Sequence, residues 1–153
     1  MKTKHGKPAS STYPLSVDYG RSVEKGVKAG RYDWVNCLFD IASRNFSTER
    51  KGTAEIVVEL IHFNRNISID KAFSQLDRMG FRPAEIHELL AFGEKYPKVQ
   101  RKFPVVALGS VWQYQFGNRR VPYLHGSGSE RGLYLYWIEY GRLEVDRFAA
   151  VRK

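Results

Sequence analysis

The chain has 153 residues, 42% of them hydrophobic and 27% charged, which are ordinary values for one globular domain. No segment approaches the roughly 18 consecutive apolar residues of a membrane span, so we expect a soluble protein. The formal net charge is +9, but the basic residues are spread along the chain, and charge alone does not establish a nucleic-acid-binding protein.

The single cysteine, Cys37, excludes an intrachain disulfide and a thiolate-rich zinc site. Because it stands beside Leu38 and Phe39, we expect it to be a small buried hydrophobic residue.

The first residues are basic and polar, without the apolar stretch of a secretory signal. We therefore expect a flexible basic tail over residues 1–12, followed by one domain over residues 13–153. In the absence of a signal or a membrane span, the expected location is cytoplasmic.

Alternating apolar residues predict a short strand around residues 15–19. Ser22 is placed to cap a short helix that ends at Gly30. Residues 33–46 mix apolar and polar residues without a clean period, and we assign them no element.

The run IVVELIHF, residues 56–63, is almost continuously apolar and predicts a central strand covered on both faces. A carboxylate in a buried strand is costly unless it is paired. We therefore expect Glu59 or His62 to face a partner or the rim of the sheet, and His62 to have a structural role.

Two amphipathic helices follow this strand. Ser68 is expected to cap the first, whose apolar positions follow a three-four spacing until Gly80. Pro83 and Glu85 suit the first turn of the second helix, which Pro97 ends.

The C-terminal half predicts four strands, at residues 105–112, 120–124, 133–137 and 147–151. Gly109 marks a bulge or a close approach in the first of them. The predicted fold class is therefore α+β, with two helices packed on a mostly antiparallel multistranded sheet.

The chain lacks a recognisable catalytic constellation. His87 and Glu88 begin a metalloprotease-like pair, but Ala91 stands where the second histidine would be. His125 has no neighbouring cysteine or aspartate. We predict no enzymatic activity, no metal and no cofactor.

The string RGLYLYWIEYGR, residues 131–142, predicts a strand with two different faces. One row is Leu133, Leu135 and Trp137, and the other is Gly132, Tyr134 and Tyr136. We expect the first row, together with Trp112, to lie in the core. Tyrosine mixed with glycine, serine, histidine and arginine is typical of recognition surfaces, so we expect the second row to bind a ligand.

Four strings resemble the variable proteins of diversity-generating retroelements: FRPAEIHELLAFGEKYP, FPVVALGSVW, GNRRVPYL and the closing RFAAVRK. The resemblance runs from about Val17 to the C-terminus. It implies a C-type lectin fold, with an early strand, two helices and a sheet whose final strand returns towards the first.

In that family a reverse transcriptase copies a template repeat with errors at adenines, and the copy replaces a C-terminal variable repeat. The resemblance implies a variable region over about residues 112–147 and a ligand-binding, receptor-like function with a protein as the expected ligand. Calcium-dependent sugar binding is not implied, because the EPN, QPD and WND motifs are absent. Carried over by position, the candidate surface is Tyr114, Arg119, Arg120, His125, Ser127, Gly132, Tyr134, Tyr136, Tyr140, Arg142 and Asp146, with the register between Glu139 and Asp146 left open.

A nucleic-acid-binding module is the alternative, in which Arg119, Arg120 and Arg142 meet phosphates while tyrosines stack on bases. The sequence does not identify the ligand, the host or the oligomeric state.

Overall fold

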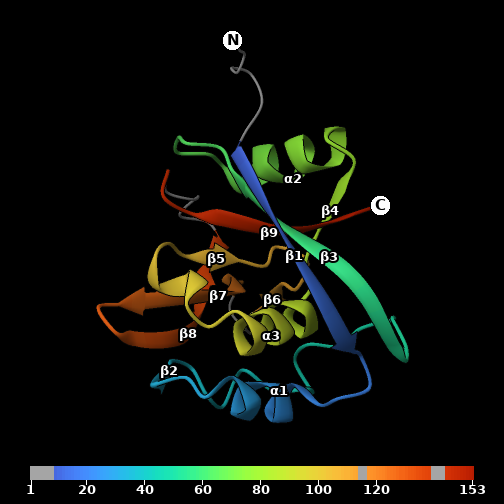
Figure 1. The fold of residues 1–153 in the computed structure, drawn as a ribbon, viewed down its shortest axis with the longest axis vertical. Coiled ribbons are helices and arrows are strands. Elements are labelled where there is room, and N and C mark those ends of the chain that lie inside the picture. Colours follow the sequence, from blue (N-terminus) through green and yellow to red (C-terminus); the bar gives the residue numbers. More distant parts are fainter. Residues whose placement is uncertain (1–8, 114–116, 139–143) are drawn as a thin grey trace.

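The computed structural model describes residues 9–113, 117–138 and 144–153 (Figure 1). The helices of this part are α1 (Val23–Gly30), α2 (Ile69–Arg78), α3 (Ile86–Lys95) and the 3₁₀ helix η1 (Val99–Arg101). The strands are β1 (Ala9–Asp18), β2 (Trp34–Val35), β3 (Thr53–His62), β4 (Phe81–Pro83), β5 (Val105–Val106), β6 (Trp112–Gln113), β7 (Arg119–Ser127), β8 (Glu130–Trp137) and β9 (Arg147–Arg152). The α+β class is confirmed: α2 and α3 are the two predicted amphipathic helices, and α1 is the short helix expected after Ser22.

The strands form one sheet in the order β1-β3-β9-β5-β7-β8-β2, with β4 also paired to β9 and β6 to β7. The pairs β2–β8 and β5–β9 are parallel and the others are antiparallel. The strand predicted at residues 56–63 is present as β3, but it lies second from one edge of the sheet. Val58 and Leu60 face one core and Ile61 the other, whereas Val57 is exposed. The last strand, β9, lies beside β3, which is in turn beside β1.

Strand β9 is covered on both faces. Phe148 and Ala150 face a core formed with α2, whereas Ala149 and Val151 face a second core formed with α1 and α3. Figure 1 accordingly shows β9 between α2 and α3. Because both faces of β9 are covered by apolar side chains, the strand can be almost wholly hydrophobic.

The helix starts follow the sequence signals in part. The Oγ atoms of Ser22 and Ser68 accept hydrogen bonds from the third backbone N–H of α1 and α2, as predicted for N-caps. The prediction for Pro83 was wrong, because it lies in β4, opposite Ala150 of β9. Helix α3 begins only after Glu85, whose side chain and that of Glu88 form a reciprocal capping box.

A fully buried carboxylate holds α3 against β4 and the chain after β1. Arg82 donates to both carboxylate oxygens of Glu88, at 3.0 and 2.7 Å, and the Tyr19 hydroxyl donates to Glu88 Oε2 at 2.6 Å. Burial alone would raise the pKa of Glu88, but these hydrogen bonds outweigh burial and lower it. Burial and the hydrogen bond to Glu88 raise the pKa of Tyr19 to about 12.

Three further expectations concern single sites. Strand β1 begins at Ala9, so the tail predicted up to residue 12 overlaps a paired strand. Cys37 is half-buried instead of buried, and Arg120 Nη1 donates to its Sγ at 3.3 Å.

Glu59 is buried and pairs with Arg152 at 3.2 Å, and His62 Nε2 lies 2.6 Å from the Glu144 carbonyl oxygen, so both have the structural partners expected. None of the described helices is long and apolar enough to cross a membrane.

Candidate binding surface

The hairpin of β7 and β8 brings the predicted aromatic positions together. A two-residue turn joins Ser127, at the end of β7, to Glu130, at the start of β8, and Gly128 in this turn has φ 62°. Cross-strand partners lie on the same face of a hairpin. Tyr134 is therefore beside Tyr123, and Tyr136 is beside Val121.

The two rows of β8 differ in burial as predicted for four of their six residues. Leu133 and Leu135 are buried in the core with α1 and α3, whereas Tyr134 and Tyr136 are half-buried. Trp137 and Trp112 are also half-buried and not fully buried as expected, although Trp112 packs against the same core. The hairpin edge exposes part of Trp137, whose ring lies 5.3 Å from the Arg120 guanidinium.

Five side chains on this face form what we call the aromatic cluster: Trp34, Tyr123, His125, Tyr134 and Tyr136. Tyr123 and Tyr134 stack, with ring centroids 5.0 Å apart and planes at 16°. Tyr136 meets Tyr123 edge-on at 5.0 Å, and the Trp34 ring lies 4.5 Å from Tyr134. Such pairs hold the rings in fixed orientations before any ligand arrives.

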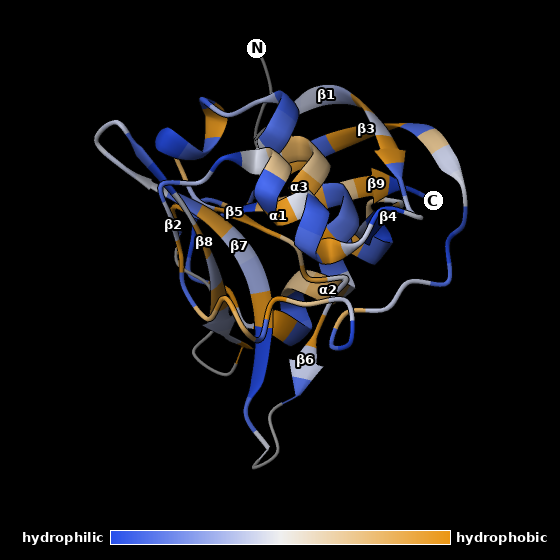
Figure 2. Cartoon of the chain, turned by 90° about the horizontal axis from the view of Figure 1, so that it is seen from below, coloured by the Kyte–Doolittle hydropathy of each residue, from blue (hydrophilic) through white to orange (hydrophobic). Residues whose placement is uncertain are grey.

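An open hollow of about 270 Å³ lies beside these rings, lined by Asn36, Tyr123, Tyr134, Leu135, Tyr136 and Trp137. Residues from both rows of β8 line this hollow, because it lies at an edge of the sheet. Strand β2 pairs with β8 only at Gly132 and Leu133, after which the chain turns away at Cys37, where φ is 62°. Among the described residues, no strand pairs with β8 on this side beyond Leu133. Strands β7, β8 and β2 lie side by side at one end of the molecule (Figure 2).

Two predicted surface positions are buried. Gly132 lies under the Trp34 indole, and a Cβ atom built on Gly132 would be 1.7 Å from that ring. Asp146 is only 6% exposed, just before β9. Neither can contact a ligand in this arrangement, which corrects both assignments.

The other predicted positions have different surroundings. Arg119 and Ser127 are exposed, while Arg120 and His125 are half-buried. The Nδ1 atom of His125 is buried and has no hydrogen-bond partner among the described residues. Tyr114, Tyr140 and Arg142 lie outside the described residues.

Sequence reasoning missed the contributions of Trp34, Asn36 and Tyr123. The last of these could have been found, because a two-residue turn at Gly128 and Ser129 places Tyr123 opposite Tyr134. Trp34 and Asn36 had no comparable signal, since a two-residue strand has no period.

The side chains of this surface provide apolar contact area and hydroxyl and amide groups that can form hydrogen bonds with a ligand. In the described part of the chain, no three histidine, cysteine, aspartate or glutamate residues are grouped so that they could hold a metal ion. An amphipathic ring surface of this kind is suited to recognition.

The described residues form an α+β fold with three α-helices and a large, mostly antiparallel sheet. Whether that fold is a C-type lectin fold stays a prediction. Comparison of the chain with protein-family models, with curated proteins and with solved structures found no match.

Proposed function

We propose that the protein binds a protein ligand through the aromatic cluster, and that it is a retroelement variable protein whose C-terminal region, about residues 112–147, is diversified on a C-type lectin scaffold. The observation that carries the proposal is the stacked and half-exposed pair of Tyr123 and Tyr134 beside an open hollow. Rigid tyrosine rings give large contact area and lose little side-chain entropy on binding.

Burial divides the candidate positions into two groups. Positions that vary must accept different side chains without loss of the fold, and exposed or half-exposed residues meet that requirement. The proposed variable set within the described residues is Arg119, Arg120, His125, Ser127, Tyr134 and Tyr136. Gly132 and Asp146 leave the set because each is buried.

The DNA around the coding region tests this origin. We expect a reverse-transcriptase gene and a near-copy of codons 112–147 that differs from the coding sequence where the near-copy has adenines. The differences should fall on codons 134 and 136 and spare codons 132, 133 and 135. Neighbouring DNA with no such copy, or differences concentrated on the leucine codons, would reject the retroelement origin.

Binding is tested separately, with a display library that varies the six positions named above and is selected against a purified folded protein. The proposal expects specific binders whose affinity falls when the selected residue at position 134 or 136 is replaced by alanine. A matched library at six exposed positions on β1 and β3 serves as the control. Equal recovery of binders from both libraries would remove any special role for the aromatic cluster.

A nucleic-acid ligand is the second candidate, supported by Arg119 and Arg120 on the strand that carries Tyr123 and by the net charge of +9. It predicts strong binding to arbitrary oligonucleotides that weakens steeply with salt. A protein-binding surface predicts weak oligonucleotide binding at moderate salt.

A further inference from the structure

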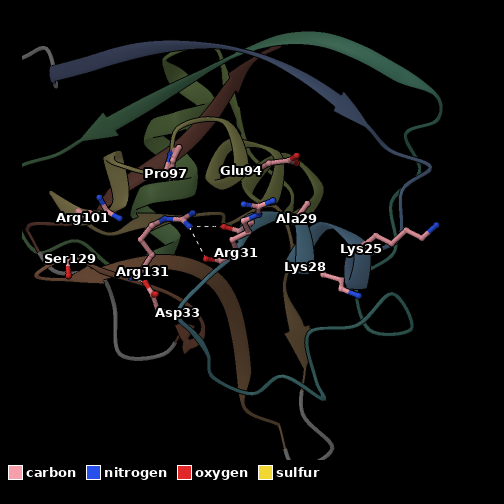
Figure 3. Close-up of a pocket in the computed structure, with 11 residues that line it drawn as sticks. Lys25, Lys28, Ala29, Arg31, Asp33, Glu94, Pro97, Arg101, Ser129 and Arg131 are labelled. Carbon is pink, nitrogen blue, oxygen red and sulfur yellow. Dashed lines mark hydrogen bonds between the residues drawn. The ribbon is translucent and has the colours of Figure 1, made fainter.

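A second hollow, of about 990 Å³, lies where the C-terminal ends of α1 and α3 approach η1 and the β7–β8 turn (Figure 3). Arg131 belongs to its lining and to the same row of β8 as Leu133. Since successive residues of a strand face opposite ways, this hollow is on the opposite face of the hairpin from Tyr134. It is therefore a site distinct from the aromatic cluster.

Exposed cations outnumber available anions around this hollow. Lys28, Arg31 and Arg101 are exposed, and none of them makes an ion pair within the described residues. Against these cations the lining has two carboxylates, one of which is already in an ion pair. Glu94 pairs with Arg21 at 3.0 Å, and Asp33 Oδ2 accepts a hydrogen bond from the Arg131 backbone N–H at 2.7 Å.

A buried guanidinium adds to the positive charge. Arg131 is 5% exposed, and its Nη atoms donate to the carbonyl oxygens of Gly30 and Gly93, at 2.7 and 2.8 Å, and to Gln100 Oε1 at 3.0 Å. All of these acceptors are uncharged. The Nε atom of Arg131 is buried and has no hydrogen-bond partner in the described part of the chain.

The charges of this hollow act on one another. Burial lowers the pKa of Arg131, and the positive charge of Arg101 lowers it further, although Tyr32 and Asp33 oppose the change. Like charges close enough to interact create a site where a bound anion is stabilised.

Helix ends explain only part of this arrangement. Cations near the C-terminus of a helix are stabilised by its dipole, which accounts for Lys28 and Arg31 at the end of α1. Arg101 lies in η1, on the other side of Arg131 from Lys28 in Figure 3. A single small anion would meet one side of the hollow, whereas a chain of anionic groups can meet both.

We propose that this hollow binds a small anion with two or more linked phosphate groups, held by Lys28 and Arg31 on one side and by Arg101 on the other. No aromatic residue lines the hollow among the described residues, so the phosphate chain is what is recognised, and no ring is available to stack on a base. Inorganic polyphosphate and nucleoside polyphosphates share this chemistry.

The experiment is calorimetric titration of the whole protein with tripolyphosphate, a nucleoside triphosphate and inorganic phosphate, at low and moderate ionic strength. Saturable binding of tripolyphosphate with one site is expected, and inorganic phosphate should bind at least about tenfold more weakly because it reaches fewer cations. Equal affinity for the two triphosphates would identify the bare phosphate chain as the ligand, and tighter binding of the nucleoside form would identify a nucleotide. Absence of saturable tripolyphosphate binding would overturn the proposal.

Charge reversal assigns the site. Arg101→Glu and Arg31→Glu should each weaken tripolyphosphate binding by about tenfold or more. Arg65→Glu is the matched control, because Arg65 is exposed, lies outside the lining and changes the net charge equally. It should change the affinity by less than about twofold. An equal loss in all three variants, each checked by its thermal unfolding curve, would show a general effect of net charge and overturn the site.

Discussion

Tyr123 on β7 and Tyr134 on β8 are cross-strand partners whose rings stack at 5.0 Å, while the next pair along the hairpin, Leu124 and Leu133, is completely buried on the opposite face. One face of the hairpin thus belongs to the core formed with α1 and α3, and the other carries half-buried rings beside Val121, which is buried in the second core. The proposed function depends on this difference in burial, because side chains can be replaced without loss of the fold only at positions that do not belong to the core.

The packing of Trp34 on Gly132 gives a first prediction. Gly132→Ala should lower the free energy of unfolding by about 2 kcal/mol, because the new methyl group would displace the indole from the sheet. Denaturant unfolding of Gly132→Ala, Trp34→Ala and the double variant measures the effect as a double-mutant cycle. We expect a coupling of about 1–2 kcal/mol, with Gly132→Ala much less costly once Trp34 is removed. Strictly additive losses would mean that the two residues do not interact.

The buried Glu88 gives a prediction about pH. Its pKa is lower in the folded chain than the ordinary value of 4.5, so its ionised form contributes stability above that value, and the contribution is lost as the pH falls through the folded pKa. Glu88→Gln should cost about 3 kcal/mol at neutral pH, because it leaves the Arg82 guanidinium without its counter-charge.

The measurement is the free energy of unfolding in urea, from neutral pH down to about pH 3. The difference between wild type and Glu88→Gln should shrink as the pH falls. Glu55→Gln, at an exposed position of β3, is the control and should leave the curve nearly unchanged. A difference that stays constant over this range would contradict the role of the ionised carboxylate.

Arg131 gives a prediction about side-chain geometry. Arg131→Lys keeps the charge but cannot reach Gly30, Gly93 and Gln100 together, so we expect a loss of about 2–3 kcal/mol. For a chain of this length each kcal/mol corresponds to about 2–4 °C in Tm. Arg101→Lys, at an exposed position, should change Tm by less than about 2 °C. Equal Tm values for wild type and Arg131→Lys would show that charge alone suffices at that position.

Local signals in the sequence were enough for several elements and insufficient for others. Ser22 and Ser68 cap helices because a cap depends on the next three residues alone. Pro83 was misassigned because its pairing with Ala150 joins positions far apart in the chain, which local patterns do not encode. The same limit applies to β3, since a strand's place in the sheet depends on which partners cover it.

The candidate surface was predictable where a period of two applied. Alternation along β8 separated Leu133 and Leu135 from Tyr134 and Tyr136 correctly. It could not show that Gly132 is covered, because the covering residue, Trp34, comes from a segment without a regular pattern. Burial of Asp146 likewise depends on how the chain enters β9 and not on its neighbours in sequence.

The most direct test of the account compares two double variants of β8 by their free energy of unfolding: Tyr134→Ser with Tyr136→Ser, and Leu133→Ser with Leu135→Ser. Losing the two half-exposed rings should cost about 3 kcal/mol and leave a cooperative unfolding transition. Losing the two buried leucines should cost about 8 kcal/mol or more and leave the chain unfolded or nearly so. If the tyrosine variant unfolds as completely as the leucine variant, the rings belong to the core and the proposed recognition surface does not exist.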